Sequence, residues 1–436
     1  MRKLKIAVVG SGISGLSCAW LLSKTHEVTV FEADSRFGGH AQTEKFGAVP
    51  IDVGFIVFNE KAYPNFSALL QHLGVGTTDT EMGFAVSLNA GRFEYSGGNL
   101  AQLLGSPRAA LSRSHWSMLS DLARFYRTAK TLAKNLSDEV SLGEFLRQHN
   151  FSKPFIERHL IPMAAAIWSS HPGQMLSYPA KAFIEFFENH QLLELGRREA
   201  WKTVAGGSVN YVKKLISNGI QLRCGDSVVK VMRDTGTNTV CCASGYEEKF
   251  DHVVLATHAD QALSILCRPS ADERRLLKSF QYSDNQVVVH RDQKLMPKRK
   301  RLWSSWNYVG GDTADKFSVT YWMNSLQKLK TKTQYFVSLN PTIEPAKSLT
   351  DMRFNCTHPI FSTATLKAQK NLWSLQGMQN TWFCGAYFGA GFHEDGLQAG
   401  LAVAEQLGGV HRPWIIPNAS ARIFVDEVPQ KLMAAE

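Results

Sequence analysis

The chain lacks the short motifs that identify several large enzyme classes. It contains no H-E-x-x-H zinc motif, no P-loop and no G-x-S-x-G nucleophile turn. Its seven cysteines are scattered without a C-x-x-C pair, and their odd number indicates a reducing compartment and not a disulfide framework. The sequence therefore predicts no metal site and gives no support to zinc, P-loop or serine-esterase chemistry.

Long uncharged runs are also scarce. Residues 6–23 form one behind a basic N-terminus, as in a signal peptide, but a glycine motif inside the run explains it better. No other uncharged apolar run reaches the length that crosses a membrane. We therefore expect a cytoplasmic protein. Its 436 residues, 44% of them apolar and 20% charged, suit two or three domains.

Acidic residues are fewer than basic ones, and the net charge is +10. One basic cluster stands out in residues 294–303, where Lys294, Lys298, Arg299, Lys300 and Arg301 alternate with Leu295, Met296, Leu302 and Trp303. Two interpretations remain: a loop at the periphery of an anionic membrane, or an ordinary solvated loop. No nucleic-acid motif accompanies the charge, so we expect no nucleic-acid partner.

The N-terminal forty residues carry the clearest motif. An apolar strand is expected at 5–9, a helix at 16–23 and a second strand at 27–32, with Gly-Ser-Gly-Ile-Ser-Gly between the first two. In this pattern Gly10 permits the tight turn, Gly12 lets a pyrophosphate approach, and Gly15 lets the helix pack on the strand; Ser14 lies in the same turn. Glu32 ends the second strand, where an acid binds a ribose 2′-OH. The sequence therefore predicts a dinucleotide site.

The next residues indicate which dinucleotide. Glu32 begins an E-x-x-x-R-x-G-G segment that ends in Arg36-Phe37-Gly38-Gly39. This segment resembles the flavin-containing amine oxidase superfamily, which includes protoporphyrinogen oxidases and phytoene-type desaturases. The resemblance implies an FAD cofactor, with Glu32 on the adenosine ribose and with Arg36, Gly38 and Gly39 along the pyrophosphate and ribityl chain.

A second FAD motif of this superfamily is matched near the C-terminus. Residues 381–387 read as a strand that contains Gly385, and a helix is expected over 396–404. By resemblance, the N-terminus of this helix, with Asp395, Gly396 and Leu397, faces the flavin, and Val228 contacts the adenine. His393 is the nearest polar candidate for a catalytic group, and a purely structural histidine is the equal alternative.

Two positions depart from the amine oxidases. His40 follows the glycine pair where many of them have arginine, and Asn285 or Gln286 stands where they carry a lysine near flavin N5. Four segments, 167–170, 187–190, 306–308 and 391–396, instead resemble a bacterial branch of FAD oxidoreductases. That branch is often encoded beside cyclopropane-fatty-acid-synthase-like methyltransferases and includes desaturases of methylated acyl chains.

We therefore expect an α/β protein with a two-domain, Rossmann-like FAD-binding fold and an inserted α+β substrate domain. The expected FAD domain is discontinuous and comprises 1–60, 203–270 and 375–410; the substrate domain comprises 61–202 and 271–374; and 411–436 form a C-terminal tail. A hairpin is expected at 84–95, and an amphipathic helix at 115–136 that either covers the domain or lies on a membrane.

Three functions remain open at this point. The first is desaturation or oxidation of an apolar, lipid-like fatty acyl chain, with a hydride passing to flavin N5. The second is amine oxidation, which the missing lysine disfavours. The third is a non-catalytic FAD-holding partner of a lipid methyltransferase.

Overall fold

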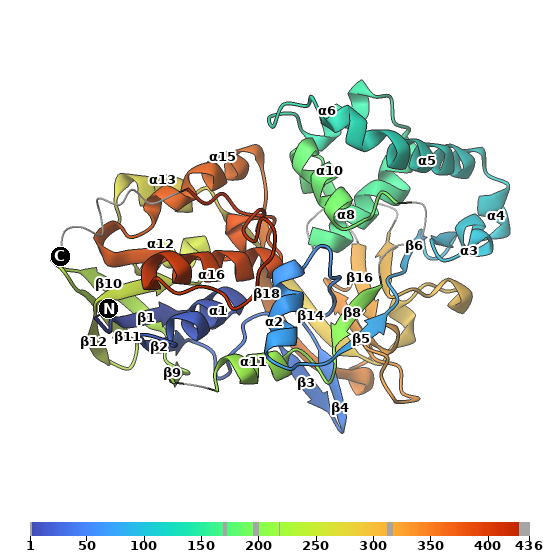
Figure 1. The fold of residues 1–436 in the computed structure, drawn as a ribbon. Helices are drawn as coiled ribbons and strands as arrows, with labels where there is room; N and C mark the ends of the chain where they lie inside the picture. The colour runs from blue at the N-terminus through green and yellow to red at the C-terminus, as the bar shows by residue number, and fades with distance from the viewer. Residues whose placement is uncertain (1, 169–171, 195–199, 218, 312–316, 427–436) are drawn as a thin grey trace.

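The protein has two lobes, which Figure 1 shows side by side in the computed structural model. The structure describes residues 2–168, 172–194, 200–217, 219–311 and 317–426. The lobe on the left holds a parallel sheet with helices packed against it, and the lobe on the right holds a larger mixed sheet below a group of helices. The predicted α/β fold of two domains is confirmed.

A five-stranded parallel sheet forms the first lobe, in the order β19-β13-β1-β2-β9. Its strands are β1 (Lys5–Val9), β2 (Glu27–Glu32), β9 (Ile220–Cys224), β13 (His252–Leu255) and β19 (Thr381–Phe383). β1 lies in the middle and is buried on both faces, which explains its nearly continuous apolar sequence. The strands come from three distant parts of the chain, so this lobe is discontinuous in sequence.

Helices α1 (Ile13–Leu22) and α16 (His393–Gly408) pack against each other through small residues. A Cβ added to Gly396 would lie 2.7 Å from the Ser14 hydroxyl oxygen, and one added to Gly400 would lie 2.2 Å from the Ser14 carbonyl oxygen. This close contact places the N-termini of the two helices next to each other. The remaining elements of this lobe are α2 (Pro64–His72), α11 (Val209–Leu215), β10 (Val228–Arg233), β11 (Asn238–Cys242), β12 (Glu247–Phe250), α12 (Ala259–Ile265), α13 (Ala271–Leu277) and α15 (Thr363–Leu372).

A seven-stranded sheet forms the floor of the second lobe, in the order β18-β14-β17-β16-β15-β6-β7. All neighbours are antiparallel except β15 and β6. The strands are β6 (Phe84–Leu88), β7 (Phe93–Ser96), β14 (Gln281–His290), β15 (Trp306–Gly310), β16 (Phe317–Trp322), β17 (Phe336–Leu339) and β18 (Thr350–Ile360). The predicted hairpin is confirmed as β6 and β7.

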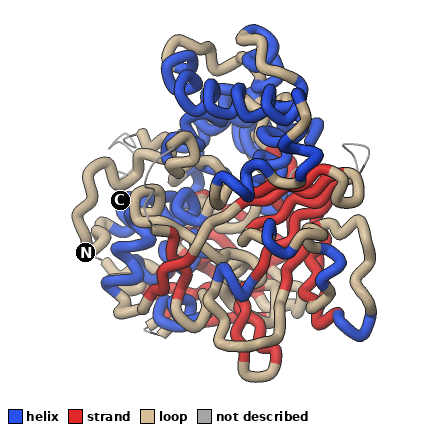
Figure 2. Tube along the Cα trace, turned by 90° about the vertical axis from the view of Figure 1, so that its right-hand side faces the viewer, coloured by secondary structure: helices blue, strands red, loops and turns tan. Residues whose placement is uncertain are grey.

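Helices from one continuous part of the chain lie over this sheet and are called the cap here. Figure 2 shows them in blue above the red strands. They are α3 (Leu100–Leu104), α4 (Pro107–Ala110), α5 (Arg113–Ala133), α6 (Leu142–Gln148), α7 (Lys153–Phe155), η1 (Ile156–Leu160), α8 (Ile161–Trp168), α9 (Pro172–Met175) and α10 (Ala180–Asn189). No helix in the described part of the chain is both long and apolar enough to cross a membrane. Two small antiparallel sheets have two strands each: β3 (Thr43–Phe46) with β4 (Val49–Asp52), and β5 (Thr77–Thr80) with β8 (Trp201–Val204).

The packing of the two apolar cores differs from the expected domain boundaries. Helices α2, α13 and α15 contribute Phe66, Leu276 and Leu372 to the core of the parallel sheet, although the expected boundaries assign all three helices to the substrate domain. Conversely, Val53 and Val57 belong to the core under the cap. The boundaries at 60/61, 270/271 and 374/375 therefore do not coincide with the edges of the two cores. The apolar faces of helices beyond each boundary pack against the core of the other lobe, and a sequence motif does not show this packing.

Most apolar side chains of the basic loop 294–303 pack inward, and Trp303 is half-buried. Leu295, Met296 and Leu302 are buried, and Arg299 forms an ion pair of 2.6 Å with the buried carboxylate of Glu94. Leu295, Met296 and Leu302 are therefore not available to a membrane, and contact of the loop's cations with one stays a prediction. In α5, the buried face includes Met118, Phe125 and Ala129, whereas Trp116 is 53% exposed.

Candidate active site

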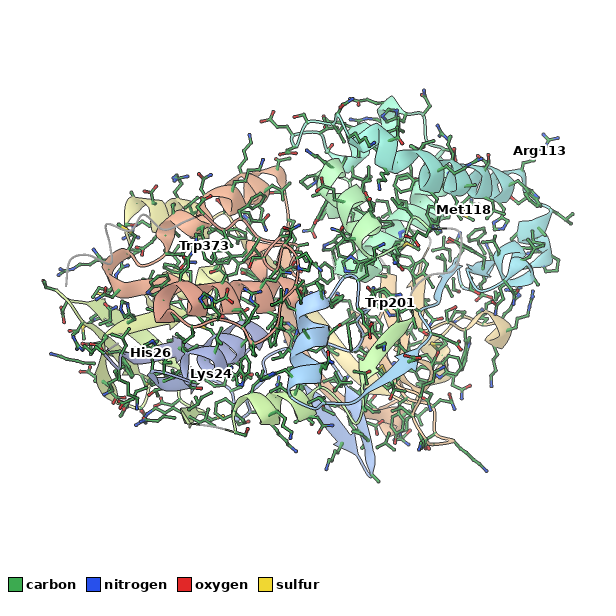
Figure 3. All side chains as sticks on the ribbon, viewed as in Figure 1. Lys24, His26, Arg113, Met118, Trp201 and Trp373 are labelled. Carbon is green, nitrogen blue, oxygen red and sulfur yellow. The ribbon has the colours of Figure 1, made fainter. Side chains whose placement is uncertain are left out.

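A large cavity is lined by residues of both lobes. It has a volume of about 1570 Å³ and runs from the glycine turn after β1 to the underside of the cap and the seven-stranded sheet. Pockets for one small ligand commonly measure about 300–1,000 Å³. Trp201, which Figure 3 labels between the lobes, is part of the lining. The cavity therefore has room for a dinucleotide and a second ligand.

The glycine turn at one end of the cavity has the shape that a pyrophosphate requires. Gly10 has a φ of +102°, and a Cβ on it would lie 2.8 Å from the Ala256 carbonyl oxygen. A Cβ on Gly15 would lie 2.0 Å from the Gly10 carbonyl oxygen, so this glycine lets α1 approach the turn. Gly12 caps α1 without a side-chain hydrogen bond, and a Cβ there would meet no protein atom within 4 Å. The open space at Gly12, in front of the helix N-terminus, fits a pyrophosphate.

Glu32 lies at the end of β2 and lines the cavity beside this turn. Its Oε2 accepts hydrogen bonds from the Ser11 backbone N–H at 3.0 Å and from the Ser11 hydroxyl at 2.5 Å. Its Oε1 accepts a hydrogen bond from the Asp34 N–H at 2.9 Å. The carboxylate is thus fixed in place by the turn, with its remaining lone pairs available to ribose hydroxyls.

The Arg-x-Gly-Gly segment folds directly onto the glycine turn. The Gly38 N–H donates to the Ser11 carbonyl at 3.0 Å, and a Cβ on Gly39 would lie 3.0 Å from Gly12 Cα. Arg36 bonds the Gly39 carbonyl at 2.9 Å and the Gln42 side chain at 2.8 Å. Arg36 therefore braces its own turn while it lines the cavity.

The sequence-predicted cofactor residues divide into two groups. Those that line the cavity are Gly10, Gly12, Ser14, Glu32, Arg36, Gly39, Val228 and Gly385. Those that lie outside the lining are Gly15, Gly38, Asp395, Gly396 and Leu397. The second group supports the first: Asp395, for example, is buried, pairs with Arg422 at 2.6 Å and accepts the Phe392 N–H at 2.7 Å. Asp395 therefore braces the N-terminus of α16, the end of the helix that the resemblance predicts to face the flavin, and does not itself line the cavity.

His393 lies at the N-terminus of α16 and lines the cavity. Its ring stacks on Phe55 with centroids 3.8 Å apart, and its Nε2 lies 2.7 Å from the Tyr211 hydroxyl. Burial, together with the nearby His40, lowers the pKa of His393 to about 3. His393 is therefore a neutral, rigidly held imidazole at neutral pH.

Three more histidines gather at the junction of the lobes, and sequence reasoning missed them as a group. The His40 ring centroid lies 6.3 Å from that of His258 and 5.6 Å from that of His358. All three line the cavity, and burial lowers their pKa values, to about 4 for His258 and about 3 for His358. Asn285, at the position expected to replace the amine oxidase lysine, donates to His358 Nδ1 at 3.1 Å. The described lining of the cavity contains no lysine.

The far end of the cavity is an apolar chamber under the cap. Phe186 of the cap stacks on Phe392 with centroids 4.6 Å apart and lies 4.6 Å from Trp168. Other apolar residues that line the chamber are Phe84, Leu103, Leu122, Met163, Trp306 and Phe354. Ser169 and Ser170, which belong to one segment of the bacterial-branch resemblance, lie outside the described residues.

The sequence from residue 13 to residue 330 matches the family model described as flavin containing amine oxidoreductase. The match spans most of the chain. The protein belongs to this family. The predicted resemblance is confirmed, and with it the assignment of the protein as an FAD-dependent oxidoreductase.

Individual relatives align with a shorter part of the chain than the family model does. Over 180 residues, or 39% of the chain, the protein is 27% identical to protoporphyrinogen oxidase 2, chloroplastic/mitochondrial, of Arabidopsis thaliana. The aligned segment spans only 34% of that relative, about a third of its length.

Two solved structures share the fold across nearly their whole length. The CLA-producing fatty acid isomerase from P. acnes has a TM-score of 0.64 and 13% identity, over 93% of this chain and 98% of that chain. Cyclohexylamine oxidase from Brevibacterium oxydans has a TM-score of 0.65 and 16% identity, over 93% of this chain and 100% of that chain. At these identities the likeness establishes the fold alone.

The residues present fit the flavin cofactor of this family. The open turn at Gly12, the fixed carboxylate of Glu32 and the helix N-terminus at His393 line one continuous cavity. The size of this cavity exceeds what one small substrate fills. A dinucleotide bound at the glycine turn would leave the apolar chamber free for a second ligand.

The buried histidines give the protein a pH-dependent stability. Burial lowers the pKa of His190 to about 3, and its Nδ1 donates to the Phe186 carbonyl at 2.9 Å. In the unfolded chain His190 has the ordinary histidine pKa of about 6.5, so the unfolded chain binds a proton more tightly than the folded one does. The free energy of unfolding therefore decreases as the pH falls below 6.5. We expect His190→Asn, whose amide can keep the Nδ1 bond, to lessen the loss of unfolding free energy between pH 7.5 and 5.5 by about 1.4 kcal/mol. Urea unfolding of the apoprotein at both pH values measures this difference, and equal losses in variant and wild type would contradict it.

Proposed function

We propose that the protein oxidises a neutral, apolar chain of the fatty acyl type, most simply by desaturation. The observation that carries this proposal is the chamber under the cap, which is walled by aromatic and aliphatic side chains from the cap helices and from the seven-stranded sheet. A long hydrocarbon chain gains free energy in such a chamber in proportion to the apolar area it buries. The family membership supplies the redox chemistry, and the chamber supplies the preference for substrate.

The polar groups of the chamber suit a substrate with little charge. His190 Nε2 and Trp306 Nε1 are buried atoms of lining residues and have no hydrogen-bond partner in the described part of the chain. One accepts and the other donates, so together they fit a neutral polar group on an otherwise apolar molecule. The fatty acid isomerase of the same fold acts, by its name, on a fatty acid, which adds support from analogy alone.

The residues of the site have distinct tasks in this reaction. When bound, FAD supplies the acceptor for two electrons and one hydrogen of the substrate. The second hydrogen leaves as a proton to solvent; the pKa values of His358 and His393, about 3, leave both imidazoles neutral at the cavity and too weakly basic to keep this proton. Asn285 donates to His358 Nδ1, which fixes the ring and makes Nδ1 the accepting nitrogen, so Nε2 carries the hydrogen. The aromatic walls orient the chain and exclude water.

Amine oxidation is the second candidate. Aromatic rings such as Trp306 and Tyr321, with centroids 5.2 Å apart at an angle of 87°, offer surfaces on which a cation can bind. The amine oxidases of the same fold support this alternative by analogy. The missing lysine and the apolar lining of the chamber favour the acyl substrate.

An anaerobic titration separates these functions. We expect phospholipids with cis-unsaturated or methylated acyl chains to bleach the visible flavin band of the purified holoprotein, and a panel of primary and secondary amines to leave it unchanged. Bleaching by an amine alone would overturn the proposal. A flavin that no member of either panel reduces would favour the third hypothesis, a non-catalytic partner of a lipid methyltransferase.

A further inference from the structure

Three large apolar side chains project from the outer edge of the cap. Leu100 begins α3 and is 71% exposed, Leu111 follows α4 and is 88% exposed, and Trp116 in the first turn of α5 is 53% exposed. The Trp116 Nε1 donates to the Ala110 carbonyl at 2.8 Å, which holds the ring beside Leu111. Figure 1 shows α3 and α4 together at the outer end of α5. We call Leu100, Leu111 and Trp116 the apolar tip.

Positive charge surrounds the apolar tip. Between Glu94 and Asp121 the sequence contains no acidic residue, and both Arg108 and Arg113 in this stretch are exposed. Figure 3 shows Arg113 pointing away from the body of the molecule. In the described part of the chain neither arginine forms an ion pair with an acid.

The basic loop 294–303 adjoins this edge. Gln102 of α3 donates to the Arg301 carbonyl at 2.8 Å, and Arg301 donates to the Gly105 carbonyl at 2.6 Å. Lys298 and Lys300 of the loop are exposed. The loop buries most of its own apolar residues, but the fold sets its cations next to apolar side chains that another segment supplies. One surface thus combines the apolar tip with the exposed cations of the basic loop, which are far apart in the sequence.

The same helices form the wall of the apolar chamber. Leu103 of α3 and both Leu122 and Tyr126 of α5 line the cavity, while Leu100 and Trp116 of these helices are exposed. Only one layer of helix therefore separates the chamber from the apolar tip.

We propose that the apolar tip and its basic surround dock the protein on an anionic phospholipid bilayer. Apolar side chains flanked by arginine and lysine bind such surfaces by inserting between head groups while the cations pair with the phosphates. A basic residue near an anionic surface contributes about fivefold in partitioning. Under the proposed function, the bilayer is the place where the protein meets its acyl substrate. Only this statement rests on the proposed function; the docking itself does not.

Vesicle sedimentation with the full-length holoprotein tests the docking. We expect binding to vesicles of phosphatidylcholine and phosphatidylglycerol but not to phosphatidylcholine alone, and a loss of binding at high salt. Leu100→Ser with Leu111→Ser should weaken binding at least tenfold, whereas Ile415→Ser, at a fully exposed position elsewhere, should not. Arg108→Glu with Arg113→Glu should also weaken binding at least tenfold.

A matched charge control excludes attraction by net charge alone. Lys213→Glu with Lys214→Glu makes the same change in net charge at exposed positions of α11, in the other lobe. Equal loss of binding in this control, wild-type binding by the apolar-tip variants, or no binding of the wild type to anionic vesicles would overturn the docking. A change of oligomeric mass in the apolar-tip variants without vesicle binding would assign the surface to a second copy of the chain instead. Reduction of the flavin by detergent-dispersed lipid is measured separately, so failure of the docking and failure of the proposed function are distinguishable.

Discussion

Replacing Gly12 by alanine is expected to abolish FAD binding and to leave the folded chain intact. Gly12 has a φ of −66°, which alanine adopts without strain, and a Cβ there would meet no protein atom within 4 Å. The added methyl group would instead occupy the space that the pyrophosphate must enter. We expect at least a hundredfold loss of FAD affinity, measured by fluorescence titration of the apoprotein, with an unchanged melting temperature of that apoprotein.

Two further glycine variants serve as comparisons for Gly12→Ala. Gly76→Ala places a Cβ 3.7 Å from the Ala205 Cβ, an ordinary contact outside the cavity, and should bind FAD as the wild type does. Gly15→Ala places a Cβ 2.0 Å from the Gly10 carbonyl oxygen and should lower both the stability of the apoprotein and its affinity for FAD. Wild-type FAD affinity in Gly12→Ala would refute the location of the pyrophosphate in front of α1.

Filling the apolar chamber should stop turnover of long chains without affecting the cofactor. Met163 of α8 lines the cavity under the cap and is only half-buried, because part of its surface faces the cavity. A tryptophan at this position would take up space that the substrate chain requires. For Met163→Trp we expect normal FAD content and a loss of at least tenfold in kcat/KM for long acyl substrates, equivalent to about 1.4 kcal/mol of transition-state stabilisation.

The chain-length dependence distinguishes a blocked chamber from a damaged fold. Shortened acyl substrates should lose less activity in Met163→Trp than long ones do. Lys134→Trp, at an exposed position after α5, adds the same side chain outside the chamber and should leave activity unchanged. Equal loss for short and long chains, or unchanged turnover of the long ones, would contradict the assignment of the chamber.

The parts of the site that sequence reasoning could predict are those written into a local pattern. The βαβ unit around Gly10, Gly12 and Gly15 has a fixed order of strand, turn, helix and acid, and each residue meets its neighbours within about thirty positions. The α16 segment is similarly local, although Asp395 turned out to brace Arg422 and the helix start and not to face the cavity.

The remaining features depend on contacts between distant segments. His40 lies in a loop, His258 is the N-cap of α12 and His358 lies in β18, so their rings meet only because three segments far apart in sequence fold together. The apolar tip and the basic loop 294–303 meet in the same way, through Arg301 and Gly105. No periodicity within one segment contains this information, because the partner lies in another.

The central claim is that FAD and a neutral acyl chain share one cavity in this protein. An anaerobic single turnover followed by mass spectrometry of the lipid tests it most directly. We expect one acyl chain to lose two hydrogen atoms for each equivalent of flavin that is reduced. Flavin reduction by an amine, with the acyl chains recovered unchanged, would contradict it.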